Sequence, residues 1–142
     1  MAKLIERLRD ASRSGVYRAS GEREIVDATR GSELRLTAID LAGIREKGAL
    51  LPKLARALEF PDWFGQNWDA LEDCLGDLSW LEAAGHVVIF RNAEELGADD
   101  TGVLRDVLAS TAEFWAGRGK PFFAVFIDPR RSSALPDLFR ER

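Results

Sequence analysis

Three carboxylates lie close together in the segment PDWFGQNWDALEDCL, residues 61–75. Asp69, Glu72 and Asp73 are spaced three and four residues apart, which places them on one side of a predicted helix. Like charges at this spacing destabilise a helix by roughly 0.2–0.5 kcal/mol per pair. A cationic partner would offset that repulsion, because Arg and Lys form short charge-assisted hydrogen bonds with carboxylates. The spacing therefore indicates a site for a basic partner, with a solvent-exposed helix face as the alternative.

Enzymatic and metal-binding chemistry suit these acids less well. Two neighbouring carboxylates can act as general acid and base, but neighbours on one helix cannot flank a sugar from opposite faces. A magnesium or calcium site is weaker still, because the sequence has no loop of alternating acids. The single histidine, His86, counts strongly against hydrolases of the Ser-His-Asp or Cys-His type. We therefore expect no catalytic residue, no metal and no cofactor.

The single cysteine and the single histidine have simple structural interpretations. Cys74 falls on the apolar stripe of the predicted helix and is expected to be a core thiol. One cysteine cannot form an intramolecular disulfide, which fits a reducing cytosol, so we expect a cytoplasmic protein. His86 opens a predicted strand without an acid or thiol nearby in the sequence, and we expect it to have a structural role at a strand edge.

Negative charge is concentrated in the middle of the chain. Residues 57–104 hold eleven acidic residues and one basic residue, which gives this segment a net charge of −10. The net charge of the whole chain is −4, so the other residues together carry +6. Aromatic residues such as Trp63, Phe64 and Trp68 interrupt the acids, which indicates a folded acidic surface rather than a tail. Such a surface repels a phosphate backbone, so nucleic acid is not expected to bind it directly. No segment approaches about 18 apolar residues, so no membrane span is expected.

The chain of 142 residues, 46% of them hydrophobic, has the length and composition of one globular domain. Apolar periodicity predicts helices over 2–10, 44–59 (beginning near Gly48, with Pro52 in its first turn), 67–75 and 101–116, and strands over 33–40, 86–91 and 121–128.

Strands that alternate with helices imply parallel pairing. We predict an α/β fold with a three-stranded parallel sheet packed by helices over residues 34–142. Residues 1–33 are predicted to be an N-terminal extension, with loop or edge strand over 11–33. The aromatic residues expected to pack in the core are Trp80, Phe114, Trp115, Phe122 and Phe123.

Residues 63–75 resemble the signature of the barstar family, the intracellular inhibitors of secreted barnase-type ribonucleases. The family pattern is two aromatic residues, Gly, a polar residue, Asn, an apolar residue, Asp-Ala-Leu, one further residue, and Asp-Cys-Leu. The chain reads WFGQNWDALEDCL at these positions. The predicted order of elements from Leu34 to Asp128 is also similar to that of the family's domain.

The resemblance implies a function for the acidic helix. In the barstar family this helix and the turn before it block the ribonuclease active site, with acids in the place of RNA phosphates. Asp73 would be the central anchor, Asp69 a second acidic contact and Trp63 the aromatic residue lying against the enzyme. Fast, salt-sensitive association is also implied, for which this family is itself a standard example. The residues that the resemblance assigns to partner binding are Trp63, Phe64, Gly65, Asn67, Asp69, Glu72 and Asp73.

The chain departs from the best-known family member at a few positions. Glu72 stands where that member has a tryptophan, and Trp63 and Phe64 stand where it has tyrosines. Such differences change which ribonuclease fits. A further acid contact on the last long helix is left open, with Glu113 as its candidate. We expect a non-catalytic inhibitor or immunity protein, monomeric when free, for a basic ribonuclease. The alternative is a regulatory interaction module with a non-nuclease partner.

Overall fold

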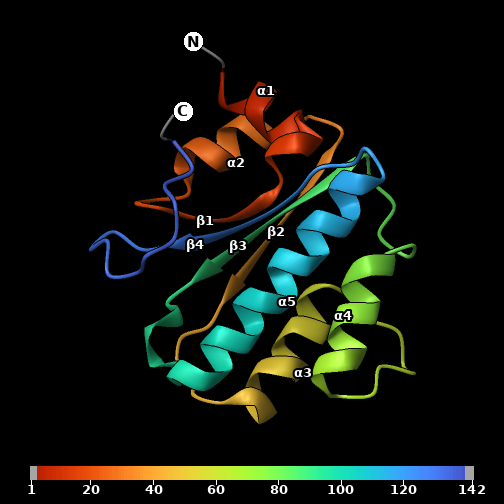
Figure 1. The fold of residues 1–142 in the computed structure, drawn as a ribbon, viewed down its shortest axis with the longest axis vertical. Helices are drawn as coiled ribbons and strands as arrows, with labels where there is room; N and C mark the ends of the chain where they lie inside the picture. Colours follow the sequence, from red (N-terminus) through yellow and green to blue (C-terminus); the bar gives the residue numbers. More distant parts are fainter. Residues whose placement is uncertain (1–2, 140–142) are drawn as a thin grey trace.

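A parallel sheet runs through the centre of the computed structural model, which describes residues 3–139 (Figure 1). Within these residues the sheet has four strands in the order β1-β4-β3-β2. Their bounds are β1 Gly15–Ala19, β2 Leu34–Asp40, β3 Gly85–Arg91 and β4 Phe122–Ile127. β2, β3 and β4 confirm the strands predicted from the sequence. The prediction of three strands was wrong, because β1 pairs with β4 and becomes an outer strand of the same sheet.

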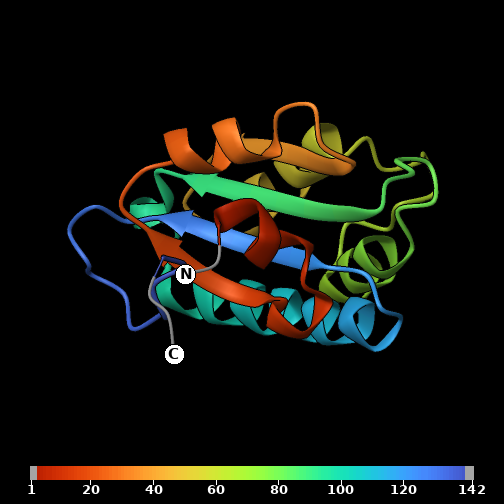
Figure 2. The same cartoon turned by 90° about the horizontal axis from the view of Figure 1, so that it is seen from above.

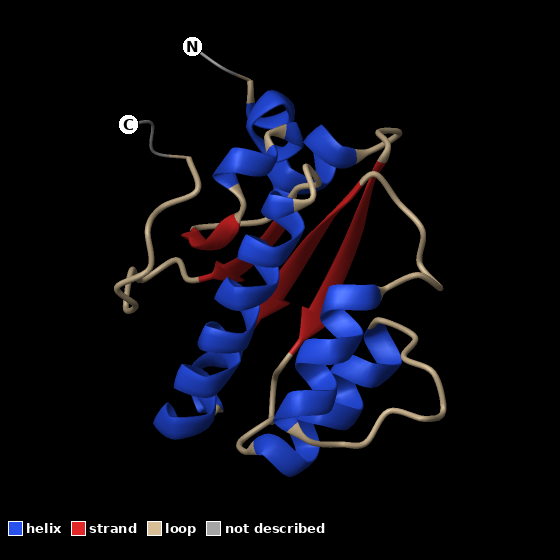
Figure 3. Ribbon diagram, turned by 45° about the vertical axis from the view of Figure 1, so that its right-hand side comes forward, coloured by secondary structure: helices blue, strands red, loops and turns tan. Residues whose placement is uncertain are grey.

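Helices cover both faces of the sheet, as Figures 2 and 3 show. The helices α1 (Leu4–Arg9) and α2 (Arg23–Thr29) lie on one face, and α3 (Lys47–Ala57), α4 (Trp68–Asp77) and α5 (Ala98–Gly117) lie on the other. The apolar side chains on both faces of the strands explain why both faces are covered. Along β3, Val87 and Ile89 join the core beneath α1 and α2, while Val88 and Phe90 join the core beneath the longer helices.

The N-terminal segment contributes to the core of this sheet. Leu8 of α1 and Ile25 of α2 pack in one buried cluster with Phe123 of β4 and with Leu138 near the other end of the chain. The division predicted at residue 33 stays a prediction, and residues 1–2 and 140–142 of the predicted units lie outside the described residues. The helix α2 was not predicted, because its seven residues are too few to show a clear period.

The helix α3 confirms the prediction over residues 44–59, with one local difference. It begins at Lys47, after Glu46, whose carboxylate accepts hydrogen bonds from the backbone of Gly48 and Ala49. Pro52 was predicted in the first turn, but it is the sixth residue of the helix. Proline has no backbone N–H, so it cannot donate the usual helical hydrogen bond to the carbonyl of Gly48.

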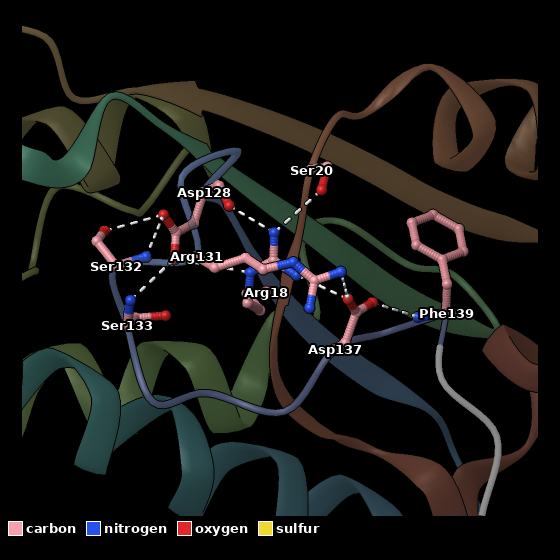
Figure 4. A network of polar contacts seen from close by, with 8 residues as sticks. All are labelled: Arg18, Ser20, Asp128, Arg131, Ser132, Ser133, Asp137 and Phe139. Atoms are coloured by element: carbon pink, nitrogen blue, oxygen red, sulfur yellow. Dashed lines mark hydrogen bonds and ion pairs between the residues drawn. The ribbon is translucent and has the colours of Figure 1, made fainter.

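A buried arginine connects β1 to the C-terminal segment (Figure 4). Arg18 is only 3% exposed, and its Nη1 donates a hydrogen bond of 2.7 Å to Asp137. Its Nη2 donates to the hydroxyl of Ser20 and to the carbonyl of Asp128. Burial acts to raise the pKa of Asp128, but hydrogen bonds from Ser132 and Ser133 outweigh it and lower that pKa to about 2. The network holds residues 128–138 against the outer edge of β1.

His86 lies inside the molecule rather than at an edge of the sheet. It is 1% exposed in the inner strand β3, with its ring centroid 5.2 Å from that of Trp115. Burial lowers the pKa of His86 to about 4, and the positive charges of Arg35 and Lys120 act in the same direction. The imidazole is therefore neutral at pH 7.

We expect Asp137→Ala to lower the free energy of unfolding by about 2–3 kcal/mol, because it leaves the buried Arg18 guanidinium without its closest carboxylate. Urea denaturation followed by circular dichroism measures the change. Asp27→Ala is the matched control, since Asp27 pairs with Arg30 on the exposed surface. The control should change stability by less than about 1 kcal/mol. Equal effects of the two substitutions would contradict the role of the network.

We expect stability to be constant with respect to His86 above about pH 6.5 and to fall as the pH drops from 6.5 towards 4, by up to roughly 3 kcal/mol. The direction follows because the folded pKa lies below the ordinary value, so acid favours the unfolded chain, which binds the proton more readily. Urea denaturation of the wild type and of His86→Leu at several pH values isolates this contribution. A wild type that loses no more stability than the variant between pH 6.5 and 4.5 would rule it out.

Candidate functional site

The helix α4 carries the acidic residues singled out in the sequence, and its start is fixed by a side-chain cap. Asn67 Oδ1 accepts a hydrogen bond of 2.7 Å from the backbone N–H of Ala70 and so caps the helix. Gln66, just before the cap, has the left-handed φ of 55° that turns the chain into the helix. The opposite side of the helix confirms the predicted apolar stripe, whose buried members are Leu71, Cys74, Leu75 and Leu78.

Buried hydrogen bonds hold α4 and the turn before it in place. Trp115 of α5 donates from Nε1 to the carbonyl of Leu75 over 2.9 Å. Trp80 donates from Nε1 to the carbonyl of Leu58 at the end of α3, also over 2.9 Å. Cys74 is buried in the core of the molecule, as predicted from the sequence. Burial raises its pKa, and the charges of Asp73 and Asp77 raise it further, so the thiol stays protonated at neutral pH.

The solvent-facing side of α4 carries four carboxylates, those of Asp69, Glu72, Asp73 and Asp77. All four residues are exposed, and none forms an ion pair or side-chain hydrogen bond with another residue in the range 3–139. Asp69, Asp73 and Asp77 follow one another at intervals of four residues, so they form a row along the helix. Within the described residues the face therefore presents negative charge that no ion pair neutralises.

The turn before α4 carries two aromatic residues, Trp63 and Phe64. Trp63 is 63% exposed and meets the ring of Trp80 edge-on at 6.3 Å. Phe64 points the other way, is only 8% exposed and packs against Phe60. The predicted aromatic pair is thus divided, with Trp63 available to a partner and Phe64 anchoring the turn in the core. A Cβ at Gly65 would lie 3.3 Å from the Asn67 amide, which crowds the cap.

A pocket of about 390 Å³ lies between α4 and α5, beside the row of acids. Phe114 lines it and is 54% exposed, so the prediction that Phe114 packs in the core was wrong. The neighbouring Trp115 is buried, and side chains of adjacent helical residues point about 100° apart, so the two rings face different surroundings. Asp77 also lines the pocket and was missed as a site residue, although it follows Asp73 by four residues. Glu113 is exposed but does not line the pocket.

Between residues 3 and 139, no three His, Cys, Asp or Glu side chains are grouped so as to hold a metal ion. No helix in that range is long and apolar enough to cross a membrane.

The sequence matches a known protein family. The family model described as Barstar (barnase inhibitor) matches residues 34–127, from the start of β2 to the end of β4. The chain belongs to the barstar family. The match includes α4, its cap and Trp63, whereas β1 and the C-terminal segment lie outside it. No curated protein matches the sequence.

Solved structures outside the barstar family share the fold. Cdc6p from Pyrobaculum aerophilum aligns with a TM-score of 0.58 and 15% identity over 89% of this chain and 36% of its own. The ORC2 protein of Aeropyrum pernix aligns with a TM-score of 0.50 and 15% identity over 88% of this chain and 36% of its own. The chain thus spans about a third of either protein. At this identity the likeness shows the arrangement of strands and helices alone.

The two ends of α4 should respond oppositely to loss of an acid. Asp69 lies in the first turn, where the helix dipole favours negative charge, whereas Asp77 ends the helix, where the dipole opposes it. We expect Asp69→Asn to lower the free energy of unfolding by roughly 0.5 kcal/mol and Asp77→Asn to raise it by a similar amount. Urea denaturation at low salt, where the charges are least screened, measures both. Changes of the same sign would show that the dipole does not govern these positions.

Proposed function

We propose that this barstar-family protein is a non-catalytic inhibitor that binds a basic ribonuclease through the exposed face of α4. The observation that carries the proposal is the row of carboxylates at Asp69, Asp73 and Asp77, which form no ion pair among residues 3–139. A ribonuclease active site must attract the phosphates of RNA, so it is rich in Arg, Lys and His. Carboxylates at similar spacing satisfy the same cations and exclude the substrate.

Asp73 occupies the centre of the proposed interface. It has Asp69 one turn before it and Asp77 one turn after it, and it borders the pocket that Phe114 also lines. Charge-assisted hydrogen bonds are strongest where water is excluded. The exposed ring of Phe114 lines the same pocket as Asp73, and the exposed ring of Trp63 stands in the turn before α4; both provide apolar surface that a docked partner would cover.

The interior of the molecule favours tight binding because it fixes α4 before the partner arrives. The cap at Asn67 holds the first turn of the helix, and the buried bond from Trp115 holds the last. Little backbone freedom is then lost on association, and preorganisation of this kind improves affinity without adding a contact. We place the inhibitor in the cytoplasm, where a ribonuclease would otherwise cleave the cell's own RNA.

A second candidate function keeps the same face and changes the partner. Glu72 lies on the exposed face at the position where the best-known family member has a tryptophan. The substitution adds a fourth charge and removes an apolar contact, so it favours a different and more basic surface. A regulatory module that binds a basic protein without nuclease activity would use Asp69, Glu72 and Asp73 in the same way.

We expect the wild type to abolish RNA cleavage by at least one member of a panel of purified barnase-type ribonucleases. Asp73→Ala should raise the Kd of that complex at least about 30-fold, the equivalent of the 2 kcal/mol that marks a dominant interface residue. Its urea denaturation curve should remain close to that of the wild type, because Asp73 is exposed and unpaired. Calorimetry and a fluorogenic RNA substrate provide the two measurements.

The control variant is Glu24→Ala, an exposed acid on α2, across the sheet from α4. It removes the same charge and should leave the Kd within about twofold, since long-range charge is screened at physiological salt. An equal rise of the Kd in the two variants would show that only the net charge of the protein matters. Normal inhibition by a folded Asp73→Ala variant would place the interface elsewhere on the molecule. If no ribonuclease in the panel is inhibited, the second candidate function replaces the first.

A further inference from the structure

A second pocket, of about 460 Å³, lies at the carboxyl ends of the strands β3 and β4. Its walls come from residues 91–94, from residues 126–130, 132 and 133, from Glu22 after β1, and from Thr101 and Arg105 of α5. Figures 1 and 2 show these strands ending on the side of the molecule that lies away from α4. The proposed inhibitor function uses none of these residues.

The chain leaves the sheet in opposite directions on the two sides of this pocket. β4 lies between β1 and β3, and all three strands are parallel. After β1 the chain continues to α2 on one face of the sheet, and after β3 it continues to α5 on the other face. In open sheets of parallel strands, ligands bind outside the carboxyl ends, in the crevice where the connections part in this way. The pocket therefore occupies the place where this kind of sheet holds a ligand.

Arg105 lines the pocket and has no anionic partner. It is half-buried and forms no ion pair among residues 3–139, and its Nε is buried without a hydrogen-bond partner. Its guanidinium lies over the ring of Phe126, 5.6 Å from the ring centroid. An aromatic face attracts a cation, but it supplies no acceptor oxygen for the donor nitrogens. A half-buried guanidinium in this state calls for an acceptor from outside the chain.

The remaining charges of the lining leave a small positive excess. Glu22 is paired with Arg91, with 2.5 Å between the carboxylate and Nε. The carboxylate of Asp128 lies 3.6 Å from Nε of Arg18. The charged lining residues that form no ion pair within residues 3–139 are Arg105, Arg130 and Glu94. Two positive charges and one negative charge thus remain, and one further negative charge would balance them.

We propose that this pocket binds a small organic molecule through a carboxylate group, with Arg105 as the residue that holds the carboxylate. The planar guanidinium matches the two oxygens of a carboxylate. A carboxylate carries the single negative charge that the lining lacks, whereas a phosphate dianion would bring an excess of negative charge close to Glu94. Phe126, Ile127 and Pro129 provide apolar surface for the body of the molecule. The volume lies in the range of pockets that hold small molecules.

The test is a titration with sodium benzoate, which joins one carboxylate to an apolar ring, followed by backbone-amide NMR at roughly 150 mM salt. We expect saturable shifts in the amides of residues 91–94 and 126–133, with a Kd below about 10 mM. The amides of α4 should not shift.

Two substitutions of Arg105 test its role in binding the carboxylate. Arg105→Ala should raise the Kd at least about tenfold, because it removes a charge-assisted contact. Arg105→Lys keeps the charge and an aliphatic stem over Phe126, so it protects the fold. It should still raise the Kd at least about threefold, since an ammonium group cannot pair with both oxygens as a guanidinium does. Arg56→Ala, an exposed arginine in the last turn of α3, is the matched control and should keep the Kd within about twofold.

Four outcomes would overturn the proposal. The first is no saturable shift up to about 50 mM benzoate. The second is a Kd in Arg105→Lys equal to that of the wild type. The third is a rise in Arg56→Ala as large as that in Arg105→Ala, which would indicate diffuse surface charge. The fourth is binding of uncharged benzamide, or of inorganic phosphate, as tight as that of benzoate. Asp73→Ala should bind benzoate normally, so failure of the inhibitor function and failure of this site give different results.

Discussion

The apolar side chains of β3 and β4 point to both faces of the sheet, and the rest of the architecture follows from their need for cover. Val88 and Phe90 are covered by the long helices, while Val87 and Ile89 require a second layer on the other face. The family segment of residues 34–127 contains only the first of these layers. Short helices from residues 4–29 complete the second, and Leu138 closes it from the other end of the chain.

The charges on the exposed face of α4 destabilise the helix rather than stabilise it. Four like charges, one of them at the unfavourable end of the helix dipole, weaken a helix taken alone. Tertiary contacts compensate for this, through the Asn67 cap and the indole of Trp115. Because buried contacts stabilise the helix, its stability does not require favourable charges on the exposed face. The placement of the acids therefore agrees with the binding role that we propose.

The sequence predicted the elements with strong periodicity, left the strand at the edge of the sheet open as loop or edge strand over residues 11–33, and missed α2. The apolar run HVVIFR predicted β3, and the periodic apolar stripe from Leu71 to Leu78 predicted α4. In both, the buried positions can be recognised from neighbouring residues alone. β1 has five residues and becomes a strand only by pairing with β4, some hundred residues later. Among the candidate site residues, the acids of α4 gathered as expected, since helical spacing alone determines their face. Phe64 turned inward and Phe114 outward, which only the packing of the turn and of α5 decides.

The junction between Arg18 and Asp137 joins positions 119 residues apart, and this separation determines when the molecule can be completed during synthesis. A ribosome releases the chain from its N-terminus, so β1 emerges early and has no strand to pair with until β4 appears. Until Leu138 has left the exit tunnel, Val87 and Ile89 on one side of the sheet lack part of their cover. The growing chain thus carries a transient apolar surface, and contacts of such long range make the final docking of the two ends a late event in folding.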